Sequence, residues 1–154
     1  MENKIILVGG YNAAGKTLFS DNLSKLLNIH CFNKDSIKEV LGDGFGSENN
    51  IVAQKGTPAA FLLMLHIAEK MLQAYNSCIF EGAFDLNEMR QIKILLEKYN
   101  CECLTFIFTG DFETLYKRHM QKNSSEKRHR VHTTTFENVN YDELYNIAKD
   151  FIDN

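Results

Sequence analysis

The residues best suited to do chemistry lie close together near the start of the chain. Residues 9–17 read GGYNAAGKT, which places Gly10, Gly15, Lys16 and Thr17 in the spacing G-x-x-x-x-G-K-T. Glycines let a backbone wrap around a phosphate with its N–H groups turned inward, and a helix starting near Lys16 aims its positive dipole end at the same anion. In that arrangement Lys16 reaches the β and γ phosphates of a nucleotide, and the Thr17 hydroxyl binds Mg²⁺. A chance match in a chain of this length is roughly one in two hundred, so the pattern predicts nucleotide binding over a simple glycine turn that caps a helix.

This loop requires a strand before it and a helix after it. Residues 4–10 (KIILVGG) form a short apolar run that ends in glycines, as expected of a buried strand. Beyond the loop, Phe19, Leu23 and Leu27 recur at the spacing of one helical face. The sequence therefore predicts a strand, a tight loop and a helix, which is the context that the motif needs.

The same alternation continues along the chain. Strands are expected at 29–33, 77–84 and 101–108, and helices at 35–41, 58–75, 85–100 and 110–122. Asp85 and Asp111 are expected to cap the last two of these helices. Residues 133–139 are open between strand and loop, with a final helix after Asn140. Alternating elements predict an α/β fold, a parallel sheet of four or five strands with helices on both faces and ligands beyond the carboxyl ends of the strands.

One connection is predicted to differ from the others. Residues 42–57 contain four glycines and are expected to form a mobile connection. Thr57 and Pro58 are then expected to start the next helix, as a cap followed by a proline in the first turn.

Length and composition limit the classes of protein. The 154 residues, 44% of them hydrophobic, fit a single domain, 1–154, that buries roughly two thirds of its unfolded surface. A formal net charge of −3 argues against a surface built mainly for nucleic acid. There is no secretory segment and no run of 18 apolar residues, so we expect a cytoplasmic protein without a membrane partner. The four cysteines, none in a C-x-x-C pair, are expected to be buried thiols.

On these features the chain resembles the P-loop kinases of the nucleoside-monophosphate-kinase-like group, often labelled AAA family ATPases, with zeta toxin, chloramphenicol phosphotransferase and polynucleotide 5′-hydroxyl kinase as relatives. The resemblance runs from Lys4 to about His132. These kinases usually carry G-x-x-G-x-G-K-[ST], and Ala13 stands where the middle glycine would be, which should tighten the loop slightly and keep every N–H donor. The resemblance implies a three-layer P-loop NTPase fold that binds ATP through Gly10, Tyr11, Asn12, Ala13, Ala14, Gly15, Lys16, Thr17 and Leu18.

The resemblance also implies an acceptor region at 35–57. In the related kinases an Asp-x-x-Arg pattern after the second strand supplies a carboxylate to the acceptor hydroxyl and a cation to the acceptor or its phosphate, and here these residues are Asp35 and Lys38. The alternative for Asp35 is a simple helix cap. Glu81 ends the third strand, where related kinases carry an acid that places Mg²⁺, its waters or the acceptor. Its alternative is an exposed acid at a strand end.

After the fourth strand the resemblance implies a lid, residues 117–132, that closes over the triphosphate with arginines. Arg118 and Arg128 are the expected catalytic arginines, and Arg130 is the reserve because EKRHRVH has one residue more than the family spacing. Donors that arrive with a lid stabilise the transferring phosphoryl group and exclude water. Three alternatives remain open for this segment: a solvated charge run, a zinc site with His129 and His132, and a patch that holds nucleic acid.

The sequence thus predicts an ATP- and Mg²⁺-dependent kinase that phosphorylates a hydroxyl of a small molecule. Lys16, Asp35, Arg118 and Arg128 are the expected catalytic residues, and Thr17 is the expected Mg²⁺ ligand. Two other functions stay open: a nucleotide-dependent switch with weak ATPase activity, and a 5′-hydroxyl kinase of nucleic acid. The acceptor and the oligomeric state are not predicted.

Overall fold

The structure is a computed structural model that describes residues 3–46, 50–125 and 127–132, and for residues 50–54 it describes the backbone alone. The segment 133–139 and the helix expected after Asn140 lie outside the described residues. Strands and helices alternate along most of the described chain, in the order β1 (Lys4–Gly10), α1 (Lys16–Leu27), β2 (His30–Asn33), α2 (Lys34–Phe45), α3 (Asn50–Gln73), β3 (Cys78–Glu81), α4 (Leu86–Lys98), β4 (Glu102–Phe108), α5 (Phe112–Asn123) and the 3₁₀ turn η1 (Arg130–His132).

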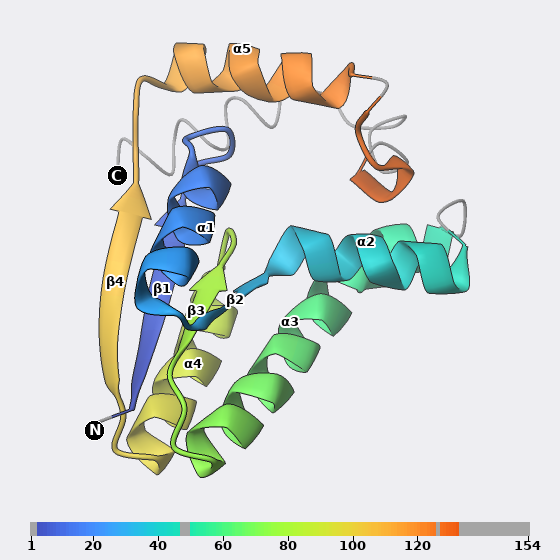
Figure 1. Cartoon of the computed structure of the whole chain (residues 1–154). Helices are drawn as coiled ribbons and strands as arrows, with labels where there is room; N and C mark the ends of the chain where they lie inside the picture. The colour runs from blue at the N-terminus through green and yellow to red at the C-terminus, as the bar shows by residue number, and fades with distance from the viewer. Residues whose placement is uncertain (1–2, 47–49, 126, 133–154) are drawn as a thin grey trace.

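The strands form one parallel sheet in the order β2-β3-β1-β4 (Figure 1). Glu81 at the end of β3 lies beside Val8 of β1 and Asn33 of β2, and Gly10 lies beside Phe108 of β4. Because the strands are parallel, their carboxyl ends meet at one edge, which is where an open α/β sheet binds ligands. The four-stranded sheet confirms the predicted α/β class.

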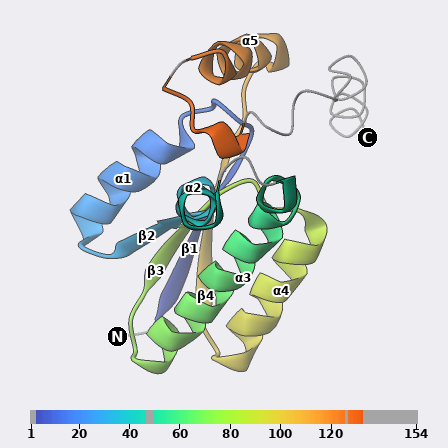
Figure 2. The ribbon, with the colours of Figure 1, turned by 90° about the vertical axis from the view of Figure 1, so that its right-hand side faces the viewer.

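Helices cover both faces of the sheet (Figure 2). Side chains alternate along β1, so that Ile5 and Leu7 pack under α3 and α4 while Ile6 and Val8 face α1. All four are buried, as expected of a central strand in a parallel sheet. The larger of the two core layers is formed by Ile5, Leu7, Phe61, Met64, Ala68, Leu72, Cys78, Phe80, Ile92 and Leu95.

The predicted mobile connection at 42–57 is wrong, and so is the helix start at Thr57. Helix α2 continues to Phe45, and α3 begins at Asn50 with Pro58 in its interior. A proline there removes one helical hydrogen bond. The buried stripe of α3 nevertheless begins upstream of it, since Gly56, Ala60 and Met64 follow one another at a spacing of four. Packing against the sheet and α2 therefore outweighs the local break.

The two predicted helix caps are confirmed. Asp85 accepts a hydrogen bond from Glu88 N, and the Glu88 side chain accepts one from Asp85 N, which completes a capping box at the start of α4. Asp111 accepts a hydrogen bond from Thr114 N at the start of α5. Both helices thus begin where their polar signals predict.

Candidate active site

The P-loop, residues 9–17, joins β1 to α1 and depends on its two glycines for different reasons. A Cβ on Gly10 would lie 2.1 Å from the carbonyl oxygen of Phe108, so only glycine allows the loop to approach β4. Gly15 has open space around it but adopts φ 93°, a left-handed conformation that costs other residues energy. Ala13 also lies in the left-handed region, with φ 60°. An L-residue pays about 1–2 kcal/mol for this conformation, so the loop holds strain where related kinases have glycine.

Lys16 is the first residue of α1 and is buried under the P-loop. Its Nζ donates to the carbonyl oxygens of Gly10 at 3.0 Å and Tyr11 at 2.7 Å. Burial lowers the pKa of Lys16, while the nearby Glu81 and Asp35 carboxylates raise it. Gly15 has no side chain to cap the first N–H groups of α1, so these donors remain available to an anion.

Glu81 lies at the centre of the strand ends and is only 4% exposed. Its Oε1 accepts a hydrogen bond from Thr17 Oγ1 at 3.2 Å, and its Oε2 accepts one from Asn33 Nδ2. Burial raises the pKa of Glu81, while Thr17 and Lys16 lower it. The exposed strand-end acid weighed from the sequence is therefore excluded. A carboxylate beside a threonine hydroxyl is a set of hard oxygen donors, and this set fits Mg²⁺.

Asn33, and not Asp35, caps α2. The Asn33 side chain accepts a hydrogen bond from Ser36 N at 2.8 Å. Asp35 lies in the first turn, where its carboxylate is exposed and lines the cavity. The alternative of a simple cap at Asp35 is thus wrong, because the residue two positions earlier already does this work.

Lys34 is a site residue that the sequence analysis missed. Its side chain is buried and its Nζ binds both carboxylate oxygens of Glu88, at 3.0 and 2.8 Å, as well as the carbonyl oxygen of Ala83. The same ammonium lies 5.0 Å from the ring centre of Phe84. These contacts tie the start of α2 to the loop after β3 through Ala83 and to the first turn of α4 through Glu88. The partners of Lys34 are more than 45 residues away in sequence, so no local pattern points to them.

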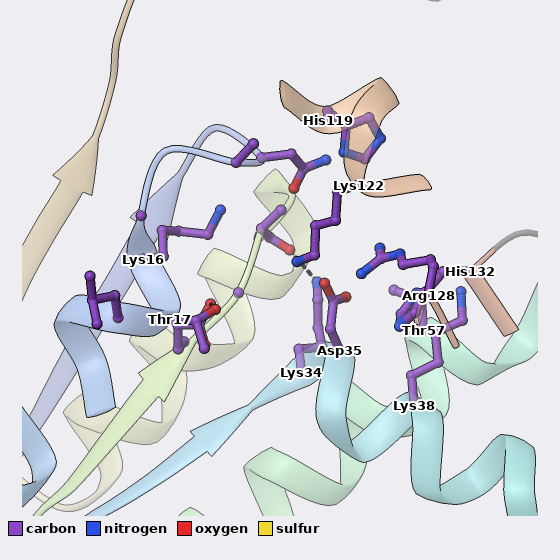
Figure 3. Close-up of a pocket in the computed structure, with 17 residues that line it drawn as sticks. Lys16, Thr17, Lys34, Asp35, Lys38, Thr57, His119, Lys122, Arg128 and His132 are labelled. Carbon is purple, nitrogen blue, oxygen red and sulfur yellow. Dashed lines mark hydrogen bonds between the residues drawn. The ribbon is translucent and has the colours of Figure 1, made fainter. Parts of the chain in front are cut away.

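These elements enclose a cavity of about 510 Å³ at the carboxyl ends of the strands (Figure 3). Its lining includes residues from the P-loop, α2, α3, the loop after β3, α5 and the segment around η1. They are Asn12, Ala13, Gly15, Lys16, Thr17, Leu18, Lys34, Asp35, Lys38, Thr57, Glu81, Gly82, Ala83, His119, Lys122, Arg128 and His132. The volume suits a small organic molecule or part of a nucleotide.

The predicted lid arginines separate in the structure. Arg128 lines the cavity, whereas Arg130 in η1 and Arg118 on α5 are exposed and outside its lining. On α5 the cavity is reached by His119 and Lys122 instead. Arg118 precedes His119 by one position and so lies about 100° away around the helix. The structure therefore brings Arg128, but not Arg118, to the predicted site.

The basic loop, residues 127–132, is docked on α2. His129 Nε2 lies 3.0 Å from Asp43 Oδ1, and His132 Nε2 lies 2.9 Å from Glu39 Oε1. Val131 between them is buried against Gly42, where an added Cβ would lie 3.2 Å from the valine. The two histidines thus pair with separate carboxylates, so the structure does not gather them around one metal. Gly42 permits this close contact.

His132 and His119 both carry lowered pKa values. Burial is the main cause for each, and the nearby Arg128 guanidinium lowers both pKa values further. The hydrogen bond from His132 to Glu39 acts in the opposite direction. Burial and Arg128 thus favour the neutral form of both imidazoles, and the cations that line the cavity are lysines and Arg128.

Comparisons with known proteins indicate the same class of protein as the fold and the P-loop. A family model described as AAA domain matches residues 5–141. Similar solved structures include a candidate kinase of Chloroflexus aurantiacus J-10-fl, with a TM-score of 0.79 and 25% sequence identity over 86% of this chain and 72% of that chain. A search of curated proteins finds no match.

In the described residues, no helix is both long and apolar enough to cross a membrane. The family match and the structural likeness each cover most of the chain. The chain belongs to the AAA domain family and is a P-loop kinase of the nucleoside-monophosphate-kinase-like group.

Proposed function

We propose that the protein transfers the γ-phosphate of ATP to a hydroxyl group of a small molecule. The observation that carries this proposal is one cavity that contains both halves of such a reaction. Lys16 and Thr17 lie on one side, and the exposed Asp35 carboxylate lies across from them (Figure 3). A protein that only binds a nucleotide would need the Lys16 and Thr17 side alone.

On the donor side the chain supplies N–H groups and the ammonium groups of Lys16 and Lys122. The open N–H groups at the start of α1 would bind the phosphates, and Lys16 would exchange its bonds to the Gly10 and Tyr11 carbonyls for phosphate oxygens. Thr17 and Glu81 would hold Mg²⁺, whose charge offsets the negative charge of the phosphates. Lys122 from α5 acts on Lys16 electrostatically and lines the same cavity, so we give it the stabilising role that the sequence suggested for Arg118.

On the acceptor side Asp35 is placed to accept a proton. The acceptor oxygen forms a bond to the γ-phosphorus while the bond from that phosphorus to the β–γ bridging oxygen breaks, and the hydroxyl proton passes to the Asp35 carboxylate. A positioned general base contributes about 10²- to 10⁴-fold to such a step. Asp35 is not used as the helix cap, so its oxygens are available for this role.

The test uses terminally labelled ATP and a metabolite extract. We expect wild-type protein to transfer the label to at least one metabolite, detected by mass spectrometry. Lys16→Ala should slow transfer by at least about 100-fold, since it removes a donor to the reacting phosphates. It should also weaken MgATP binding by roughly 10- to 100-fold through the loss of a charged hydrogen bond. Lys25→Ala, on the exposed side of the same helix, is the matched control and should retain both.

Other outcomes identify the alternatives. ADP and free phosphate without any labelled metabolite would contradict the proposal and indicate a slow nucleotide-hydrolysing switch. Label on an added 5′-hydroxyl oligonucleotide, and on nothing in the extract, would indicate a nucleic-acid kinase. Unchanged transfer by Lys16→Ala would contradict the assignment of the donor side.

A further inference from the structure

Asn33 contacts both sides of the site through a single side chain. It is the last residue of β2 and directly precedes α2, which carries Asp35 (Figure 1). Its Oδ1 accepts a hydrogen bond from Ser36 N at 2.8 Å, and its Nδ2 donates to Oε2 of Glu81. One amide therefore holds the first turn of α2 with its oxygen and the buried Glu81 carboxylate with its nitrogen.

The register of the sheet explains why these two side chains meet. Asn33 and Glu81 are opposite each other in the parallel pair of β2 and β3, and each is the last residue of its strand. Side chains at matching positions of neighbouring strands leave the sheet on the same face. Glu81 lines the cavity, whereas Asn33 is half-buried and outside the lining. Asn33 therefore acts on the site through the Glu81 carboxylate.

Each oxygen of the Glu81 carboxylate has its own donor. Oε1 accepts a hydrogen bond from Thr17 Oγ1 at 3.2 Å, and Oε2 accepts one from Asn33 Nδ2. Because the amide holds Oε2, the carboxylate is restrained from rotating, and Oε1 stays beside the threonine hydroxyl. Groups that orient a metal ligand in this way typically change metal affinity by roughly 10- to 100-fold when they are removed.

An amide suits this position better than the other common helix caps. Ser36 N can only donate and an ionised Glu81 carboxylate can only accept, so the two partners determine which end of the amide faces each of them. Aspartate and serine cap helices as well as asparagine does. However, aspartate has no N–H to donate, and serine ends one atom short of the position of Nδ2. A residue needed only as a cap would not require the amide nitrogen.

We propose that Asn33 is a positioning residue whose amide orients the Glu81 carboxylate for Mg²⁺ and ties the Mg²⁺ site to the helix that carries Asp35. The inference rests on the proposed function, which places Mg²⁺ at Thr17 and Glu81 and the reacting hydroxyl at Asp35. The donor and acceptor sides come from different elements of the fold. A single hydrogen-bonded amide between them would keep the metal ligand and the proton acceptor in one arrangement.

A second anchor of α2 allows this role to be separated from a purely structural one. Lys34 bonds to Glu88 on α4 and to the carbonyl oxygen of Ala83, so it fastens α2 without contacting the proposed Mg²⁺ ligands. Helix α2 should therefore stay docked when the Asn33 amide is removed. The expected consequence of that removal is a less well oriented Glu81.

The test exchanges one helix cap for another. In Asn33→Ser the hydroxyl can still cap α2, but the donor to Glu81 is lost. Binding of AMPPNP, an ATP analogue that is not hydrolysed, is measured by calorimetry in EDTA and across a Mg²⁺ titration. We expect an affinity in EDTA close to that of the wild type and a half-saturating Mg²⁺ concentration roughly 10- to 100-fold higher. Asp111→Ser makes the same exchange at the cap of α5 and should change neither value.

A double variant identifies the group through which Asn33 acts. Glu81→Gln should itself raise the half-saturating Mg²⁺ concentration, because it removes a charged ligand. If Asn33 acts through this carboxylate, Asn33→Ser should add little to the effect of Glu81→Gln. Full additivity of the two substitutions would mean that Asn33 affects Mg²⁺ by another route, and would overturn the inference.

Three other binding results would also overturn it. An unchanged half-saturating Mg²⁺ concentration in Asn33→Ser would show that Asn33 is a helix cap alone. An equal loss of AMPPNP affinity in EDTA and in Mg²⁺ would indicate a disturbed P-loop. The same rise in Asp111→Ser would indicate a general effect of exchanging caps. By contrast, a wild type whose AMPPNP binding does not respond to Mg²⁺ would contradict the donor side of the proposed function, and the inference with it.

The link to Asp35 is tested by phosphoryl transfer. With the metabolite that the wild type labels and with saturating Mg²⁺, Asn33→Ser should slow a single turnover by roughly 10- to 100-fold, since a small misplacement of a reacting group is costly. Transfer at the wild-type rate under these conditions would overturn the link to Asp35. If the wild type labels no metabolite, the kinase function is contradicted and the link to Asp35 with it, whereas the binding result on Mg²⁺ still stands.

Discussion

The two sides of the cavity are built in different ways. The core of the donor side is one continuous stretch, residues 9–17, whose own carbonyl oxygens hold Lys16 in place, and Glu81 and Lys122 lie beside it. The acceptor side is assembled from α2, Thr57 on α3 and the basic loop. Among the described residues, Lys38 and the Arg128 Nε have no hydrogen-bond partner there. Lys16 on the donor side is thus held by the protein itself, whereas Lys38 and Arg128 on the acceptor side are not.

The difference has a physical consequence. Removing one member of a buried ion pair destabilises a fold because it leaves the other charge unpaired, whereas removing a buried charge that has no partner can stabilise it. Helix α2 allows a direct comparison of the two cases, because Lys34 and Lys38 lie one turn apart and both are buried.

Replacing Lys34 should destabilise the protein. Lys34→Met leaves the buried Glu88 carboxylate without its ammonium, which typically costs about 3–5 kcal/mol. Denaturant unfolding measures the change. The double variant Lys34→Met/Glu88→Leu should recover much of the loss, and Lys93→Met, in the exposed pair with Glu97, should change stability by less than about 0.5 kcal/mol. A Lys34→Met protein as stable as the wild type would show that the pair does not hold α2.

Replacing Lys38 should have the opposite sign. Lys38→Met removes a largely buried side chain whose ammonium has no ion-pair partner in the described part of the chain, so we expect the ligand-free protein to gain up to about 1 kcal/mol in free energy of unfolding. The pKa of Lys38 is lowered in the fold, which means that protonation at neutral pH favours the unfolded chain. The gain should therefore shrink as the pH rises toward the ordinary lysine value. A loss of stability at neutral pH would mean that Lys38 has a structural partner.

Replacing Ala13 tests the strain in the P-loop. Ala13→Gly should relieve the left-handed conformation and stabilise the protein by up to about 1 kcal/mol, after the greater freedom of glycine in the unfolded chain is subtracted. For a chain of this size that corresponds to roughly 2–4 °C in melting temperature. Ala14→Gly is the control without a positive φ and should not stabilise. Equal effects of the two variants would exclude strain at Ala13.

The contact between the basic loop and α2 should depend weakly on pH. His132 has a folded pKa below its ordinary value of 6.5 because it is buried and lies near Arg128. The unfolded chain therefore binds more protons as the pH falls below 6.5, so the free energy of unfolding should fall there and be unaffected above it. Urea unfolding between about pH 7.5 and pH 5.5 should show a smaller slope in His132→Gln. The same slope in both proteins would assign the effect to another group, with His119 the next candidate.

The parts of the molecule that the sequence predicts are those determined by neighbouring residues. The P-loop, the order of strands and helices and the caps at Asp85 and Asp111 all rest on local patterns, and the structure has them in place. The glycines and the proline at 42–58 predict a break in structure that is absent from α2 and α3, because Gly42 lies against Val131 of the basic loop and Gly56 is buried within α3. This close packing depends on distant segments and leaves no local pattern.

Only part of the acceptor side was predicted, because only some of its residues are marked by a local pattern. Asp35 and Lys38 follow a strand and could be chosen by position, and both line the cavity. Lys34, Thr57 and His119 could not be chosen, because their roles depend on contacts between segments far apart in sequence. The choice among Arg118, Arg128 and Arg130 likewise depends on how the basic loop docks on α2, which the Asp43 and Glu39 partners determine.

The most direct test of the proposed phosphoryl transfer is a single-turnover measurement on Asp35→Asn with saturating MgATP and the metabolite that the wild type labels. We expect nucleotide affinity within about twofold of the wild type, because the groups proposed to bind the phosphates do not include Asp35. We also expect phosphoryl transfer to be slower by at least about 100-fold, because the proton acceptor is lost. Transfer at the wild-type rate, or a loss of nucleotide affinity as large as that of Lys16→Ala, would contradict the division of this cavity into a donor side and an acceptor side.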